Sequence, residues 1–246
     1  MDKVLLQQYI LDSKKIAIIV EKNLFLDGKI ERLFLPNNRP HINEYRKSKE
    51  IRESYQKFMK ENLLSEYPFE INSIYKKILK LDESLLVQGI INLNIDGVLK
   101  KNNAKNVIDL EGNINWLYCS NCGSESSMES FVLNQDEIIC KNCNDNSLKV
   151  NIPFNGQEPS QWDFKDSWML MNSCDCLIIL TADFISPITF SFIDMVTKKH
   201  NKVIFSGNLI DFRQGNTPAF FSDSHFISSI DDFLDIILEL INNRYS

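Results

Sequence analysis

Six cysteines carry the clearest chemical pattern in this chain of 246 residues. Four of them form two Cys-x-x-Cys pairs with 17 residues between the pairs: Cys119, Cys122, Cys140 and Cys143. A tight Cys-x-x-Cys turn delivers two thiolates from one loop, and two such turns complete the tetrahedron that Zn²⁺ prefers. The pattern therefore predicts a structural zinc with four protein ligands. Cys174 and Cys176 precede an apolar run, so we expect them to pack in the core.

Polar side chains gather in two short segments in front of these cysteines. The first, Asn92–Gly97, contains Asn94 and Asp96, which could bind a ligand or cap the turn that follows. The second, Val107–Gly112, ends in Glu111-Gly112. Glu111 could be a cleft carboxylate without a chemical task, or a general base if burial raises its pKa. The residue types alone leave both pairs of alternatives open.

The elements that must position these residues follow from the apolar patterning. Continuous apolar runs predict buried strands at 15–20, 85–92, 174–180 and 202–206. Helical patterning predicts helices at 3–11, 43–60, 72–81, 167–172, 190–199 and 229–242. Strands that alternate with helices predict a doubly wound parallel sheet. We expect short strands around the metal at 131–139 and a loop at 154–163.

Composition excludes several classes of protein. The net charge is −6, and the run of basic residues at 46–60 alternates with Glu, so a nucleic-acid interface is not expected. No apolar run is long enough to span a membrane. Since the cysteines fit a zinc pattern and no secretory signal is visible, we expect a cytoplasmic protein.

The chain resembles the sirtuins, the family of NAD-dependent protein deacylases, at motifs that occur in the family's order. Asn94-Ile95-Asp96-Gly97 matches the end of the family's Thr-Gln-Asn-Ile-Asp-Gly motif, and 107–112 resembles the apolar stretch before the catalytic His-Gly. The four cysteines match in order and spacing. Residues 154–158 resemble the family's Phe-Gly-Glu substrate loop, and 203–209 resemble the strand and Asn-Leu near the adenosine. The resemblance covers nearly the whole chain.

This resemblance implies an α/β fold in which a Rossmann-like doubly wound parallel sheet carries a small zinc-ribbon and helical module. It implies one sirtuin-like domain over residues 1–246. The Rossmann-like part would comprise about 1–30, 86–111 and 160–246, the helical insertion about 31–85 and the zinc module about 112–152.

The resemblance also implies site residues. Asn94, Asp96 and Asn208 match family positions near NAD, and Glu111 stands where the family has its catalytic His. In the family that His deprotonates a ribose hydroxyl after nicotinamide has been displaced, a task suited to a group that titrates near neutrality.

The departures from the family pattern fall at the positions that carry its chemistry. The family's Gly-Ala-Gly-Ile-Ser loop corresponds to about 20–24, which contains no glycine, and the Gln of the core motif is Leu93. Glycines let the backbone close on the NAD phosphates, so NAD binding is doubtful. The family's Gly-Thr-Ser turn is Thr181-Ala182-Asp183, which adds a negative charge near an anionic cofactor.

Three functional hypotheses follow. The first is a catalytically degenerate sirtuin homologue that acts as a binding, scaffold or regulatory protein, with a protein partner and room for a nucleotide-like small molecule. The second is a diverged NAD-using enzyme, namely a protein deacylase, ADP-ribosyltransferase or NAD glycohydrolase, with Glu111 in place of the His. The third and weakest is a zinc-ribbon nucleic-acid binder, which the acidic balance of charges disfavours.

Overall fold

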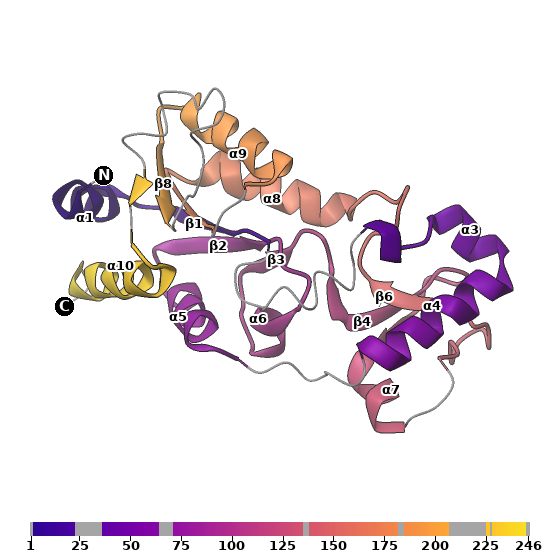
Figure 1. Ribbon diagram of the computed structural model, residues 1–246. Helices are drawn as coiled ribbons and strands as arrows, with labels where there is room; N and C mark the ends of the chain where they lie inside the picture. The colour runs from indigo at the N-terminus through magenta and orange to yellow at the C-terminus, as the bar shows by residue number, and fades with distance from the viewer. Residues whose placement is uncertain are drawn as a thin grey trace.

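Two sheets of different size organise the protein (Figure 1). The structure, a computed structural model, describes residues 2–22, 36–63, 71–134, 138–181, 185–206, 225–226 and 228–244. The larger sheet has six strands in the order β3-β2-β1-β7-β8-β9, and its neighbouring strands pair in parallel. Its strands are β1 Ile16–Val20, β2 Val87–Asn92, β3 Val107–Asp109, β7 Cys176–Leu180, β8 Lys202–Ser206 and β9 His225–Phe226.

Helices cover both faces of this sheet, as the sequence predicts for a doubly wound fold. On one face lie α1 Lys3–Asp12, α5 Ser73–Asp82, α6 Val98–Lys101 and α10 Ile230–Arg244. On the other face lie α8 Gln161–Ser173 and α9 Pro187–Thr197. Every residue of β1 is buried: Ile16, Ile18 and Val20 face the first layer, while Ala17 and Ile19 face the second. Alternate side chains of one strand thus enter two cores, which explains its unbroken apolar run.

The strand order reverses beside β1. The chain proceeds from β1 through β2 to β3 on one side, and from β7 through β8 to β9 on the other. The carboxyl ends of β1 and β7 therefore meet at a topological switch point, where open α/β sheets bind ligands.

The smaller unit surrounds the cysteine pairs. Its antiparallel sheet has the order β5-β4-β6, formed by β4 Asn113–Cys119, β5 Glu125–Ser127 and β6 Leu148–Asn151. Among the described residues, this part includes the helices α3 Ile42–Lys47, α4 Lys49–Asn62 and α7 Met128–Asn134. Its core contains an aromatic cluster in which Tyr45, Tyr55 and Phe154 pack edge to face with ring centroids 4.9–5.7 Å apart.

Most predicted elements of the larger sheet are present with small shifts at their ends, and β3 and β9 are additions that the sequence analysis did not predict as strands. The helix α5 packs with α10 against the larger sheet. The limits of the parts along the chain, including the helical insertion at about 31–85, stay a prediction.

The prediction of one helix over 43–60 is wrong, because the helix is interrupted at Ser48. Its backbone is extended (φ −106°, ψ 122°), and its N–H donates to Glu44 O, which ends α3. Its Oγ accepts from Ile51 N at 3.3 Å, which starts α4. A serine can offer this local hydrogen bond in place of helical continuation.

Two other predictions near the cysteines are wrong. Residues 131–134 belong to α7 instead of a strand, residues 135–137 lie outside the described part of the chain, and β6 lies further on, at 148–151. Residues 161–163 form the first turn of α8, which is longer than the predicted 167–172. Ser160 Oγ accepts from Asp163 N at 3.3 Å, and this Ser-x-x-Asp cap is a helix-start signal that the sequence did contain.

Candidate functional site

The four knuckle cysteines converge in one cluster beside the smaller sheet. Their sulfur atoms all lie within 4.8 Å of one another, with Cys119–Cys143 at 3.7 Å and Cys122–Cys140 at 3.6 Å. Four sulfurs at about 2.3 Å from a tetrahedral Zn²⁺ lie about 3.8 Å apart. The donor set and its spacing therefore fit zinc, and the four thiolates would fill every coordination position.

The surroundings of the cluster act in opposite directions on its thiols. The side-chain amides of Asn142 and Asn121 lie within hydrogen-bonding distance of Cys122 Sγ (3.4 Å) and Cys143 Sγ (3.7 Å). The Asn142 amide, followed by Ser124, lowers the pKa of Cys122 to about 5. Burial raises the pKa of Cys119 to about 12, so its deprotonation at neutral pH requires a nearby positive charge. A bound Zn²⁺ would supply that charge and would tie β4 to the second knuckle.

Glu111 lies at the carboxyl edge of the larger sheet, just after β3. Its Oε1 lies 2.5 Å from Lys22 Nζ, which follows β1. The two side chains are 24% and 34% exposed, so the ion pair lies near the protein surface and is only partly desolvated. Sequence reasoning identified Glu111 and missed Lys22, because the partner comes from a segment 89 positions away along the chain.

Asn94 and Asp96 lie in the loop after β2, and both are buried. Asn94 Nδ2 donates to Glu21 O at 2.9 Å, which ties this loop to the end of β1. Asp96 Oδ1 accepts from Val98 N at 2.9 Å, which caps α6, and Oδ2 accepts from Tyr75 Oη on α5. These contacts correspond to the structural alternative stated above, in which the residues maintain the loop. The ligand-binding alternative stays a prediction.

A second carboxylate, Asp109, organises the same edge and escaped the sequence reading. It accepts from Asn92 Nδ2 at 2.9 Å and from Asn113 Nδ2 at 2.8 Å, and Lys100 Nζ lies 3.5 Å away. Burial raises the pKa of Asp109, and these partners oppose the rise. Asparagines that precede and follow a buried acid are the signal that could have identified this network.

Glu21 is a further acidic group at this edge, besides Glu111, Asp96 and Asp109. It follows β1 directly and is fully buried. Its Oε1 accepts from Ser186 N at 3.1 Å and Ser186 Oγ at 3.3 Å. We expected a loop without glycine here, but the sequence did not show that its first side chain turns inward.

The described residues of this loop do not fit the pyrophosphate of NAD, the cofactor that the resemblance implies. Such a group needs backbone N–H donors at close approach and a positive or neutral surface. Here a buried carboxylate, Glu21, occupies the helix end next to the loop, and Lys22 is engaged by Glu111. Asn208 and residues 182–184 lie outside the described residues.

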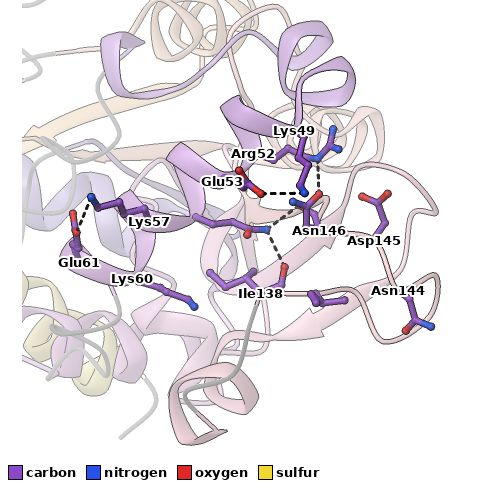
Figure 2. A pocket seen from close by; sticks show the side chains of 12 residues that line it. Lys49, Arg52, Glu53, Lys57, Lys60, Glu61, Ile138, Asn144, Asp145 and Asn146 are labelled. Atoms are coloured by element: carbon purple, nitrogen blue, oxygen red, sulfur yellow. Dashed lines mark hydrogen bonds and ion pairs between the residues drawn. The ribbon is translucent and has the colours of Figure 1, made fainter.

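Pockets also occur away from this edge. The largest of those described, about 740 Å³, lies between α4 and the segment that carries the second knuckle (Figure 2). Arg52 Nε donates to Asn146 Oδ1 at 2.7 Å, and Gln56 Nε2 donates to Ile138 O and Asn146 O. These bonds join α4 to the segment that carries the second Cys-x-x-Cys pair.

The fold and the cysteine cluster define a class: a Rossmann-like α/β protein with a zinc-ribbon module. The sequence model of the Sir2 family matches residues 29–185, which is more than half of the chain. The chain therefore belongs to the Sir2 family, as the sequence motifs indicated. Within the described residues, no helix has the length and apolar character needed to cross a membrane.

Curated relatives carry related names. An NAD-dependent protein deacetylase of Thermotoga maritima is 26% identical over 54% of this chain and 55% of its own length. One of Staphylococcus epidermidis is 27% identical over 70% of this chain and 65% of its own length. The matches thus span between about half and two thirds of these relatives.

Solved structures agree on the fold over the full length. One described as the structural basis for the mechanism and regulation of Sir2 enzymes has a TM-score of 0.78 at 16% identity, over 99% of this chain and 98% of that one. Sir2Tm bound to a propionylated peptide has a TM-score of 0.72 at 18% identity, over 97% and 98%. A Sir2 complex with a p53 peptide and NAD⁺ has a TM-score of 0.69 at 19% identity, over 100% of both chains.

Proposed function

We propose that this member of the Sir2 family is a catalytically degenerate, zinc-containing protein that acts through binding, as a scaffold or regulatory subunit. The observation that carries the proposal is the ion pair between Lys22 and Glu111 at 2.5 Å. It joins the two segments that would carry the phosphate loop and the catalytic base of an active relative.

The ion pair argues against Glu111 as a general base. A base must accept a proton from a substrate hydroxyl within hydrogen-bonding reach. The Glu111 carboxylate is already paired with Lys22 Nζ at 2.5 Å, so a substrate hydroxyl would have to compete with an ammonium group for it. The carboxylate is therefore better suited to closing the cleft than to proton transfer.

The proposed partners follow from what the fold retains. A protein partner fits a family whose solved relatives include complexes with peptides, and a nucleotide-like small molecule is the second candidate ligand. The structural role of zinc and a cytoplasmic location remain predictions of the same proposal.

Calorimetric titration of the zinc-loaded full chain with NAD and with ADP-ribose tests the proposal. We expect no binding of either ligand at millimolar concentration and no NAD-dependent deacetylation of acetyl-lysine peptides. The Thermotoga maritima relative serves as the positive control. Turnover by this chain that disappears in Glu111→Ala, but persists in a control such as Glu239→Ala on the exposed face of α10, would overturn the proposal.

The second candidate is a diverged NAD-using enzyme, and the names of the curated relatives favour it. An assay of nicotinamide release, with and without an acetyl-lysine peptide, separates its forms. Release without peptide would indicate an NAD glycohydrolase or ADP-ribosyltransferase. Release only with peptide would indicate a deacylase.

A further inference from the structure

Glu21 stands at the position of the sheet where a ligand is expected. It follows β1 at the switch point, and its N–H donates to Leu180 O of β7 at 2.9 Å. Its own carbonyl accepts from Asn94 Nδ2 at 2.9 Å. The backbone of Glu21 is thus fixed by β7 on one side and by the loop after β2 on the other, and its side chain has a defined place beside the carboxyl ends of β1 and β7.

The carboxylate of Glu21 points to the N-terminus of α9, a helix of 11 residues. Its Oε1 accepts from the N–H and the hydroxyl of Ser186, the N-cap residue. A helix N-terminus carries unpaired N–H donors and a partial positive charge, and it is a common binding place for phosphate. Here a side chain of the protein itself supplies the anion.

The other oxygen of this carboxylate shows that the arrangement is costly. Glu21 is 0% exposed, and Oε2 has no hydrogen-bond partner among the residues that the structure describes. Pro187 begins the helix and has no N–H to offer. Burial raises the pKa of Glu21, and polar contacts with the Thr189 hydroxyl, with Ser186 and with the backbone of Lys22 oppose the rise. Burying a carboxylate with one oxygen unpaired costs free energy, so packing alone does not explain why a glutamate stands at this position.

We propose that Glu21 is an internal anion that occupies the phosphate position at the switch point and makes the cleft reject ligands with a pyrophosphate group there. This inference rests on the proposed function and deepens it, since it names the residue that sets the ligand class. A phosphate at the N-terminus of α9 would have to take over the hydrogen bonds that Ser186 donates to Glu21. It would then lie next to the displaced carboxylate and be repelled by its charge. Removal of the carboxylate therefore converts the same helix end into an open anion site.

The test uses the zinc-loaded full chain with two substitutions at this residue. Glu21→Ala removes the side chain beyond Cβ, and Glu21→Gln removes the charge while it keeps the shape. The probes are inorganic pyrophosphate and ADP-ribose, titrated by calorimetry. Zinc content is measured afterwards, so that extraction of the metal by pyrophosphate is recognised. Glu239→Gln on α10 controls for the loss of one negative charge far from the cleft.

We expect ADP-ribose to bind Glu21→Ala at least tenfold more tightly than the native chain, with a smaller gain for Glu21→Gln and none for Glu239→Gln. Pyrophosphate should follow the same order. Unchanged affinity in a folded Glu21→Ala or Glu21→Gln protein overturns the inference, and so does micromolar binding of pyrophosphate to the native chain. NAD turnover by the native chain would instead overturn the proposed function, so the two failures are distinguishable.

Discussion

Two carboxylates at the carboxyl edge of the larger sheet show how differently one residue type can be placed. Glu111 forms a partly exposed ion pair with Lys22. Glu21 is fully buried, and its carboxylate lies against the N-terminal end of α9, where Ser186 donates to it. Exposed pairs contribute little to stability, whereas a buried carboxylate couples strongly to it. The pH dependence of folding should therefore report on Glu21.

We expect Glu21→Gln to stabilise the fold increasingly as the pH rises above 4.5, the ordinary pKa of the side chain. Burial raises the pKa of Glu21 in the native state. Between 4.5 and the raised pKa, the unfolded chain releases the proton while the native chain keeps it. The stability that protonated Glu21 provides is thus present below pH 4.5 and lost as the pH rises through the native pKa.

Urea unfolding of both proteins from pH 4 to 8 measures this effect. The raised pKa of Asp109 acts in both proteins and cancels in the difference between their free energies of unfolding. A difference that does not change with pH would show that Glu21 titrates alike in the folded and unfolded states.

The elements show where patterning in the sequence was sufficient. Strands such as β1 and β7 are buried along their whole length, so their unbroken apolar runs could be recognised without knowledge of their neighbours. The break between α3 and α4 could not be recognised in this way, since charged residues continue on both sides of Ser48. There, the Ser48 hydroxyl oxygen accepts a hydrogen bond from Ile51 N, and this bond starts a new helix.

Ser48→Ala should lower the free energy of unfolding by about 1 kcal/mol, the usual cost of losing a helix N-cap. The variant loses the hydrogen bond between Ser48 Oγ and Ile51 N at the start of α4. Ser48→Asp is the matched control, because its carboxylate can accept the same bond and favours the N-terminus of a helix. Urea unfolding compares the three proteins. A gain in helical content without loss of stability in Ser48→Ala would mean that the two helices merge, as we first predicted.

At the scale of the whole molecule, the sequence predicted the chemistry of the zinc module better than the state of the cleft. The four cysteines lie along the chain in an order and spacing that require no knowledge of the fold. The state of the cleft depends on pairs such as Lys22 with Glu111 and Glu21 with Ser186, which only the folded sheet brings together. Long-range pairs of this kind leave no periodic trace in a single sequence.

The separation of the cores predicts what removal of zinc does. Cys119 and Cys140 pack in the core of the smaller unit, together with Tyr45 and Met59, while the two cores of the larger sheet contain none of the four knuckle cysteines among their described members. A structural zinc contributes directly to the stability of the unit that it closes. We therefore expect Cys140→Ser to lose the metal and to unfold the smaller unit first.

Hydrogen exchange measured by mass spectrometry locates this effect. Peptides from β4 and β6 should lose protection in Cys140→Ser, whereas peptides from β1 and β7 should keep more of theirs, because they lie in separate cores. Cys174→Ser is the matched control: it alters a buried cysteine outside the cluster and should keep stoichiometric zinc. A metal-free Cys140→Ser protein with full protection in β4 and β6 would show that packing alone holds the smaller sheet together.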